Sequence, residues 1–329
     1  MKTFFILIFL LYFSLFKLSA EEWELKKINF QTENDADFRD DAAYSYGSGL
    51  SILFYRKDIN SSLFYIPFSS YKGGDDYISF GFSHQLYTPE DFENPNLIED
   101  DRPYAGYMYL QLGLYKSLNN TLTSLNIQVG IVGPSSQMES VQKIIHDLIG
   151  SPEPMGWQYQ IKDEPIFQLN FSQKKYYNLD NIFGFGYNSS ILPEYGFDFG
   201  NASTKLYVST LFRWGKGVPH DYGAYTIDNT SYSKIPLKSE VVHYNKKWKY
   251  YFNFSLKTNL IAKNIFLDGN TFKESHSVRK NYFTLETGYG LSFVYDHFSI
   301  DYLRRHTSKE FQSQKKLYSY GSLLFSYAY

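Results

Sequence analysis

The sequence predicts an all-β protein, a transmembrane antiparallel β-barrel of about twelve strands with a short helix in an extracellular loop. Three observations predict this fold. Apolar and polar residues alternate over many short segments, aromatic residues make up 20 % of the 329 residues, and the chain has no cysteine although it begins with an export signal. Barrels are closed by hydrogen bonds between strands, so they need no disulfides, and they place aromatic side chains at both membrane interfaces.

The export signal covers residues 1-20, which are typical of a secretory signal peptide. Lys2 gives a basic start, residues 4–16 form an unbroken apolar run, and Ala20 is the small residue that precedes a cleavage site. The run is too short to span a membrane comfortably, and no stop-transfer pattern follows, which disfavours an uncleaved anchor. Residues 21-329 are therefore expected to form one barrel domain in the outer membrane of a Gram-negative cell.

Alternating segments give the individual strands. The strands are expected to begin near Trp23, Gly47, Tyr77, Ala105, Leu122, Ile166, Asn181, Ala202, Lys247, Asn281, Phe298 and Leu317. The last strand ends on an aromatic residue, which is typical of outer-membrane barrels. The alternative interpretation of this segment is an ordinary terminal strand in a soluble sandwich. In the segment that begins at Leu122, Asn126 and Gln128 are predicted to face the lumen, and Val129 is predicted to face lipid.

Connections between these strands differ in length. Turns such as 118–120 and 296–297 are short and are expected on the periplasmic side. Longer connections are expected to gather at the extracellular rim, and they cover residues 35–46, 88–104, 133–164, 215–239 and 268–280. The formal net charge of -2 gives no reason to expect a nucleic acid partner.

One long connection contains an amphipathic helix within residues 133–150. Ser136 and Glu139 have the spacing of a capping box, and Gly150 is a suitable C-cap. Gln142 and His146 are four residues apart, so they share one face of this helix. A histidine alone is more often structural than catalytic, but this pair on a rare helix is a candidate site.

Oxygen-bearing side chains are dense just after the first strand. Asn34, Asp35 and Asp41 lie in the segment ENDADFRDD, and carboxylates and amides are the ligands that calcium prefers. The spacing is not that of an EF-hand, and a loop that binds divalent ions loosely is the simpler interpretation of this segment alone. The sequence also lacks the GxSxG, HExxH and glycine-rich phosphate-binding motifs.

Several long motifs occur in a fixed order along the chain. They are ENDADFRDDAAYSYGSGL, QLYTP, DDRPYAG, VGIVGPSSQMESVQKIIHDLIG, GWQYQIKDEP, PEYGFDFGNASTKLYVSTLFRWG, LDGNTFKESHSV and RHTSKEF. Together they span nearly the whole chain after the signal peptide. In these motifs the sequence resembles the lipid A 3′-O-deacylase family of outer-membrane barrels.

The resemblance implies a site between the barrel wall and the loop helix, where a histidine and a calcium ion hydrolyse the 3′ ester of lipid A. Asn34 and Asp35 fall on the family's Asn-Asp pair, and Ser45 falls where relatives usually have threonine. Gln142 and His146 fall on the helix glutamine and the catalytic histidine. The expected roles are catalytic for His146, Gln142, Ser45 and Asn34, and metal-binding for Asp35, Asn34 and Asp41.

The resemblance implies lipid A or lipopolysaccharide as the partner. Outer-membrane lipid is expected around the barrel, and the chain is expected to be a monomer. The loop before DDRPYAG is strongly acidic, and Arg102 is the nearby cation expected to contact substrate. Two other functions stay open. One is an outer-membrane phospholipase with the same chemistry, and the other is a non-catalytic porin or adhesin. The many Tyr and Gln residues at inward positions indicate a filled lumen, which disfavours a pore.

Overall fold

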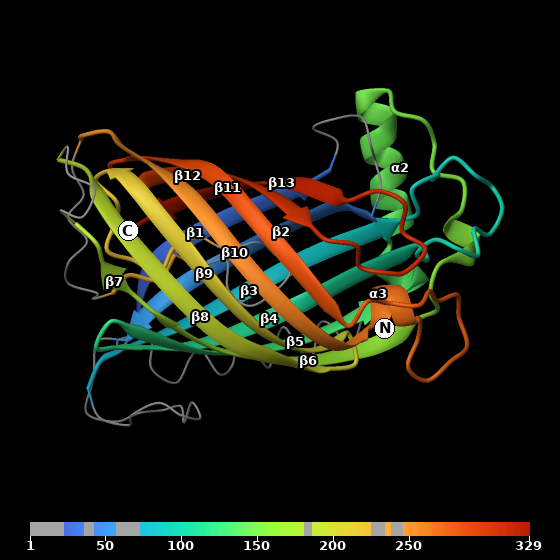
Figure 1. Ribbon diagram of the computed structural model, residues 1–329, viewed down its shortest axis with the longest axis horizontal. Helices are drawn as coiled ribbons and strands as arrows, with labels where there is room; N and C mark the ends of the chain where they lie inside the picture. Colours follow the sequence, from blue (N-terminus) through green and yellow to red (C-terminus); the bar gives the residue numbers. More distant parts are fainter. Residues whose placement is uncertain (1–22, 36–42, 57–72, 181–185, 225–233, 238–245) are drawn as a thin grey trace.

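The structure is a computed structural model, and it describes residues 23–35, 43–56, 73–180, 186–224, 234–237 and 246–329. Figure 1 shows one tilted barrel with helix α2 standing across its long axis at one end. The strands are β1 (Trp23–Asn34), β2 (Ala43–Arg56), β3 (Asp75–Thr88), β4 (Ala105–Leu118), β5 (Thr121–Val132), β6 (Glu164–Lys175), β7 (Tyr177–Asn178), β8 (Asn188–Gly200), β9 (Ser203–Lys216), β10 (Lys249–Asn264), β11 (Phe283–Tyr295), β12 (Phe298–Thr307) and β13 (Tyr318–Ala328).

Twelve long strands close the barrel, and β7 is a two-residue addition that pairs with β8. Successive strands pair antiparallel, β6 pairs with β8, and β1 pairs with β13 to complete the ring. The prediction of a twelve-stranded antiparallel barrel is therefore confirmed. Two short 3-10 turns, η2 (Pro134–Ser136) and η3 (Trp157–Tyr159), and the helices α2 (Met138–Ile149) and α3 (Ile265–Asp268) lie in the connections.

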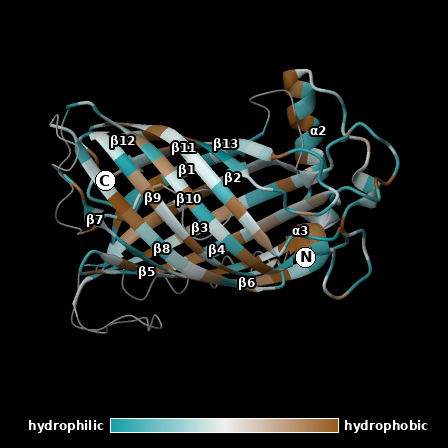
Figure 2. Cartoon of the chain, viewed as in Figure 1, coloured by the Kyte–Doolittle hydropathy of each residue, from teal (hydrophilic) through white to brown (hydrophobic). Residues whose placement is uncertain are grey.

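The barrel wall has a polar inner side and an apolar outer side. On β5, Asn126 and Gln128 are buried in the barrel, where Asn126 Oδ1 accepts hydrogen bonds from Gln111 and Tyr115, while Val129 is exposed. The predicted alternation on this strand is confirmed. Figure 2 shows brown and teal residues alternating along the strands. The outer side exposes many large apolar residues, which include Phe30, Leu50, Phe82, Phe167, Leu206, Phe252, Phe254, Leu291 and Phe325.

The two ends of the barrel carry different connections. The end with α2, called here the α2 end, receives the connections between β3 and β4, β5 and β6, β10 and β11, and β12 and β13. The opposite end has tight turns at Asn119–Asn120 and Asp296–His297, in which Asn119, Asn120 and Asp296 adopt positive φ angles. These two predicted short turns are confirmed.

One expectation about the connections is wrong. The long connection after β9 lies at the opposite end and not with the others at the α2 end. The reason is the two-residue link Asn201–Ala202 between β8 and β9, which occupies the α2 end at that point of the wall. Long and short connections therefore do not alternate strictly around this barrel.

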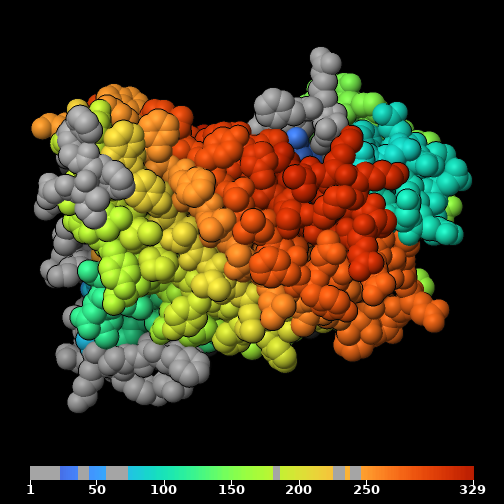
Figure 3. All heavy atoms as spheres, in the orientation of Figure 1, coloured from blue at the N-terminus to red at the C-terminus, as the bar shows by residue number. Residues whose placement is uncertain are grey.

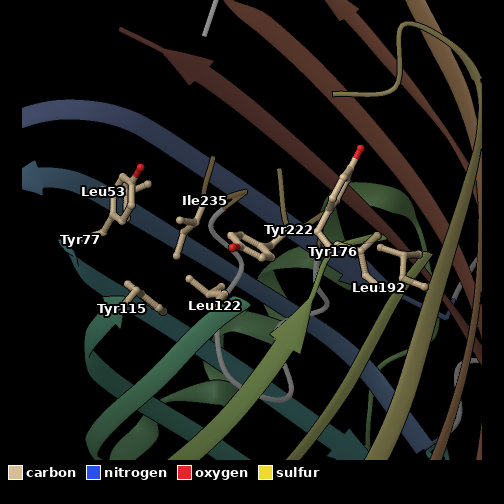
Figure 4. Packing of buried hydrophobic residues seen from close by; sticks show 9 residues of the cluster. Leu53, Tyr77, Tyr115, Leu122, Tyr176, Leu192, Tyr222 and Ile235 are labelled. Atoms are coloured by element: carbon tan, nitrogen blue, oxygen red, sulfur yellow. The ribbon is translucent and has the colours of Figure 1, made fainter. Parts of the chain in front are cut away.

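Part of that connection enters the barrel and fills the opposite end. Tyr222 and Ile235 are fully buried, and Figure 4 shows them among residues of the surrounding strands, including Leu122 and Tyr115. The Ser117 hydroxyl lies 2.9 Å from the Tyr222 hydroxyl and donates to the Leu237 carbonyl. We call the described parts of this connection, residues 217–224 and 234–237, the plug.

Buried ion pairs hold the plug to the wall. Lys234 Nζ lies 2.8 and 3.0 Å from the two carboxylate oxygens of Asp301 on β12. Arg213 on β9 donates to the Asp221 carboxylate at 2.5 Å and to the Asp221 backbone carbonyl at 2.8 Å. Burial is the strongest influence on Lys234 and opposes its positive charge, but Asp301, Tyr251 and Asp221 together outweigh burial and raise the pKa of that lysine. The plug and its ion pairs fill part of the lumen at this end of the barrel.

In the part of the chain that the structure describes, no helix is both long and apolar enough to cross a membrane. The predicted signal peptide lies outside the described residues and stays a prediction, as does the division into residues 1-20 and 21-329.

Candidate functional site

The helix α2 begins differently from the prediction. Its N-cap is Gln137, which has a left-handed φ of 63° and no capping side-chain hydrogen bond. Ser136 belongs to the preceding turn η2, where its hydroxyl donates to the Gly133 carbonyl at 2.6 Å. The predicted capping box is therefore wrong, because a 3-10 turn takes up the serine first. The predicted C-cap is confirmed, since Gly150 has a φ of 69°.

The start of α2 packs directly on the barrel wall. A Cβ atom on Gly106 of β4 would lie 2.7 Å from Met138 Cβ, so only glycine permits this approach. Met138 is buried with Leu86, Tyr104 and Trp157 in one apolar cluster. The helix thus leaves the wall at β4 and extends away from it, as Figure 1 shows.

Gln142 and His146 lie on the buried face of α2, as their spacing predicted. Their exposed fractions are 2 % and 4 %, and Met138 precedes them in the same row. Helix side chains four residues apart project together, so this row faces the segments that cover the helix. Both polar side chains are therefore withdrawn from bulk water.

A backbone carbonyl orients the His146 ring. His146 Nδ1 lies 2.5 Å from the Pro152 carbonyl oxygen. A carbonyl can only accept, so Nδ1 carries the proton, and in the neutral ring the lone pair is on Nε2. The Phe92 ring packs against the imidazole at 5.5 Å between ring centres and an interplanar angle of 88°. This arrangement fixes the tautomer and the orientation of the His146 ring.

Gln142 is held by an indole. Trp157 Nε1 donates to Gln142 Oε1 at 2.8 Å. The Gln142 amide nitrogen is buried and has no hydrogen-bond partner among the described residues. A buried donor without a partner costs free energy, about 1–3 kcal/mol, unless a ligand or water accepts its proton. Gln142 therefore presents an amide donor beside His146.

Asn34 and Ser45 meet where β1 and β2 reach the α2 end. Asn34 is the last residue of β1 and pairs with Tyr46 of β2. Ser45 sits in a break of the β2–β3 register, and its hydroxyl lies 2.5 Å from that of Thr88. Tyr46 packs against the apolar cluster that contains Met138, so these strand ends and α2 belong to one corner of the barrel.

Asp35 follows directly and is 4 % exposed. It lines a cavity of about 570 Å³ together with Phe92, and the other walls come from residues 90–101 and 313–319. Phe92 therefore contacts both this cavity and the His146 ring. The structure brings Asp35, Asn34, Ser45, Gln142 and His146 to the same corner.

Asp41, the third predicted metal ligand, lies outside the described residues. Within the described ranges, no group of three or more His, Cys, Asp or Glu side chains is arranged to hold a metal ion. Asp35 supplies a buried carboxylate beside an acidic cavity, which is a donor chemistry that suits calcium. The full predicted calcium shell stays a prediction.

Arg102 is placed differently from a phosphate-binding residue. Its side chain is 1 % exposed, and its guanidinium lies 2.5 Å from the Glu310 carboxylate. The rings of Tyr87, Phe311 and Tyr318 surround it at 5.5 to 5.8 Å. Burial is the strongest influence and opposes its charge, but Glu310 together with Tyr318, Asp101 and Tyr87 outweighs burial and raises the pKa of Arg102. The buried guanidinium leaves little surface for a phosphate.

The Arg102 ion pair joins two connections at the α2 end. The connection between β3 and β4 and the one between β12 and β13 lie side by side, in cyan and red in Figure 3. Lys316 and Glu90 form a second ion pair between them at 2.9 Å. The 570 Å³ cavity lies between these same connections. Arg102 therefore positions the walls of the cavity that Asp35 lines.

Sequence reasoning missed four residues of this site. They are Thr88, Phe92, Pro152 and Trp157. Thr88 and Trp157 lie within QLYTP and GWQYQIKDEP, two motifs that carried the resemblance, so the signal for them was present. Pro152 acts through its backbone carbonyl and Phe92 through packing, and neither role leaves a mark in the sequence.

Comparisons with known proteins show the family to which the chain belongs. Residues 4–329 match the family described as outer membrane protein LpxR. No curated protein sequence matches the chain. Among solved structures, the chain is similar to LpxR from Salmonella typhimurium, with a TM-score of 0.71, 17 % identity, and coverage of 92 % of this chain and 100 % of that one.

Two autotransporter domains are also similar to the chain, at lower scores. The β domain of BrkA from Bordetella has a TM-score of 0.43 and 10 % identity, covering 94 % of this chain and 99 % of that one. The translocator domain of NalP from Neisseria meningitidis has a TM-score of 0.44 and 8 % identity, covering 94 % and 88 %. The family match, which covers nearly the whole chain, decides the assignment. The chain belongs to the LpxR family of outer-membrane proteins, the lipid A 3′-O-deacylase family that its motifs indicated.

Proposed function

We propose that this protein hydrolyses the ester that holds the 3′ acyloxyacyl chain of lipid A, with His146 as general base. The observation that carries the proposal is the hydrogen bond from His146 Nδ1 to the Pro152 carbonyl. It directs the lone pair of the neutral ring to Nε2, the nitrogen that would face a water molecule. The His146 position on a buried helix face in an LpxR-family barrel supports the assignment.

The proposed reaction proceeds through addition and elimination. His146 Nε2 takes a proton from water while the water oxygen attacks the ester carbonyl carbon. The bond from that carbon to the sugar 3′ oxygen then breaks, and the imidazolium returns its proton to the leaving oxygen. The products are a free acyloxyacyl carboxylic acid and a lipid A with a 3′ hydroxyl. No serine nucleophile is needed.

Gln142 and Ser45 would orient the reactants. The Gln142 amide nitrogen, which is buried beside the base, would donate to the water or to the ester oxygen. The Ser45 hydroxyl, paired with Thr88, would complete the hydrogen bonds at the strand ends. We assign Arg102 to positioning, because Glu310 and three aromatic rings already surround its guanidinium.

Calcium is proposed as the cofactor, held by Asp35 and Asn34 together with Asp41. A bound calcium ion would polarise the ester carbonyl and stabilise the negative charge that develops on its oxygen. The proposed substrate is lipid A or lipopolysaccharide in the outer leaflet, and the barrel is proposed to act as a monomer.

Mass spectrometry of lipid A from cells that express the protein tests the proposal. Wild type should remove the mass of the 3′ chains, and His146→Ala should leave lipid A intact while the barrel still folds. His306→Ala, on β12, is the matched histidine control and should behave as wild type. A folded wild-type barrel that leaves the 3′ chains in place would contradict the proposal.

Two further readings of the same experiment separate the alternatives. A chelator should abolish the mass loss, and added calcium should restore it. Activity that persists under chelation would remove calcium from the mechanism. Release of fatty acid from glycerophospholipid, with lipid A unchanged, would instead assign the site to a phospholipase.

A further inference from the structure

Helix α2 has three kinds of side chain along its length. The buried row faces the covering segments, a second row is charged, and the rest of the surface is apolar. The buried row is Met138, Gln142 and His146, the charged row is Glu139, Lys143 and Asp147, and the exposed apolar face is Ile144 and Leu148. The charged row is internally paired, since Lys143 lies 3.1 Å from Glu139 and 3.4 Å from Glu153 of the following segment.

The apolar face is strongly exposed. Ile144 is 60 % and Leu148 is 80 % exposed. Single exposed apolar residues are common on protein surfaces, but two large ones one turn apart on the same helix face form a patch. Figure 2 shows hydrophobic residues in brown on the part of α2 that extends beyond the barrel wall. In water this patch would be unfavourable.

The direction of the apolar face follows from helix geometry. Residues two positions apart in an α-helix differ by about 200° around its axis, so Ile144 lies opposite Gln142, and Leu148 lies opposite His146. The buried row faces Trp157 and Phe92. These residues belong to connections that lie beyond the barrel end, on the far side of α2 from the strands (Figure 1). The apolar face therefore points away from these connections, toward the side of α2 on which the barrel wall lies.

The outer side of the wall near this corner is itself apolar. Leu50 on β2 and Phe82 on β3, which pair midway along their strands, are 48 % and 43 % exposed. In an outer-membrane barrel, this surface contacts the hydrocarbon of the bilayer. The apolar face of α2 lies beside this lipid-facing surface. The molecules that contact it should therefore also be apolar.

We propose that α2 lies in the plane of the outer leaflet as an interfacial helix, with Ile144 and Leu148 inserted among lipid acyl chains. The paired charges of the Lys143 row lie at the level of the headgroups. Interfacial helices have this combination of a polar and an apolar face. If the proposed function holds, on which this consequence rests, insertion sets the depth of His146 relative to the ester bonds of lipid A.

The chain has no cysteine, so single-cysteine variants can be labelled without a background. Leu148→Cys and, as a second position, Ile144→Cys would carry an environment-sensitive fluorophore. The folded barrel would be placed in vesicles of phosphatidylethanolamine and phosphatidylglycerol that contain lipids spin-labelled on the acyl chain. Phe82→Cys is the lipid-facing control, and Glu99→Cys, on the exposed connection between β3 and β4, is the water-facing control.

Insertion predicts that both α2 labels emit at shorter wavelength than the Glu99 label and lose fluorescence to the spin-labelled lipid, as the Phe82 label does. Labels that respond to iodide in water as strongly as the Glu99 label would overturn the proposal. Labels shielded from both quenchers would also overturn it, because protein and not lipid would then cover the face. None of these readings depends on enzymatic activity, so they are independent of the deacylase test.

Discussion

The two ends of the barrel differ in how their buried charged and polar groups are paired. At the plug end, Lys234 and Asp301 neutralise each other, and the Tyr222 hydroxyl meets that of Ser117. At the α2 end, the Gln142 amide nitrogen is buried with no partner among the described residues. The buried charges of the plug are therefore paired with side chains of the wall, whereas the α2 end keeps an amide donor for another molecule.

This difference indicates that the plug end contributes to stability and that the α2 end is the place for chemistry. Buried groups that are fully paired favour one rigid arrangement, whereas buried groups that wait for a ligand lower stability and mark a functional site. The plug end should therefore tolerate little change without unfolding. The α2 end should tolerate substitutions that remove activity and leave the barrel intact.

The largest expected effect on activity is that of His146→Ala. Loss of a general base should lower the rate of ester hydrolysis by about 10²–10⁴-fold. The urea midpoint of unfolding in lipid should change little, because His146 lies on a helix outside the strand ladder. A rate assay on purified lipid A and an unfolding curve would measure both. Equal losses of activity and stability would contradict the proposal that the α2 end tolerates loss of its functional side chains.

At the plug end, Lys234→Met should have the largest effect on stability. It leaves the Asp301 carboxylate buried without its ammonium partner, which should cost about 3–5 kcal/mol in the free energy of unfolding. Lys143→Met, at an exposed pair on α2, is the matched control and should cost less than about 0.5 kcal/mol. Adding Asp301→Leu to Lys234→Met should recover much of the loss.

The pH dependence of this pair follows from the raised pKa of Lys234. A group with a raised folded pKa stabilises fully below its unfolded value and loses this contribution as pH rises through the folded value. The unfolded value of lysine is 10.5, so the pair should contribute equally from pH 6 to pH 9. An unfolding series that shows the Lys234→Met penalty disappearing between pH 7 and pH 9 would contradict the assigned ion pair.

A smaller effect is expected from Trp157→Phe. It removes the donor to Gln142 Oε1 but keeps an aromatic ring in the apolar cluster. The lost orientation should lower kcat about tenfold, with KM nearly unchanged, because the hydrogen bond is worth about 1–1.5 kcal/mol. Trp248→Phe, at an exposed tryptophan, is the control. A rise in KM alone would show that the indole acts on binding and not on orientation.

The smallest effect is expected at Ser45. Ser45→Ala loses the contact with the Thr88 hydroxyl and should lower the rate about two- to tenfold. Ser45→Thr keeps the hydroxyl and should stay within about twofold of wild type, since only a methyl group is added. Steady-state rates of the three proteins decide this. Equal activity of the alanine variant would show that the hydroxyl only joins β2 to β3.

Period-two alternation predicted the barrel well because each strand has one polar and one apolar side. It also gave the burial of Asn126 and Gln128. The connection after β9 was misplaced because it was assigned by its length: residues 215–239 follow the eighth predicted strand, so counting strands puts them at the end with the short turns. The Lys234–Asp301 pair was hidden from the sequence, since its partners are far apart in the chain.

For the site, the helical spacing of Gln142 and His146 predicted a shared face, and the structure has both on the buried side of α2. The role of Arg102 differs because an arginine in an acidic loop gives no hint of which carboxylate it will meet. Its partner, Glu310, comes from the last connection of the chain. Asp41 lies outside the described residues, and the predicted ligand set stays a prediction.

The seam of the barrel has a consequence for its assembly. β1 pairs with β13 along Lys27 to Asn34, and Phe30 stacks on Phe325 across this junction. The first and last strands of the ring are thus neighbours in space, and their contacts have the highest sequence separation that the fold contains. Closure must wait until the whole chain has been exported. Until then β1 is an open edge, which a periplasmic chaperone or the assembly machinery would have to protect from pairing with other chains.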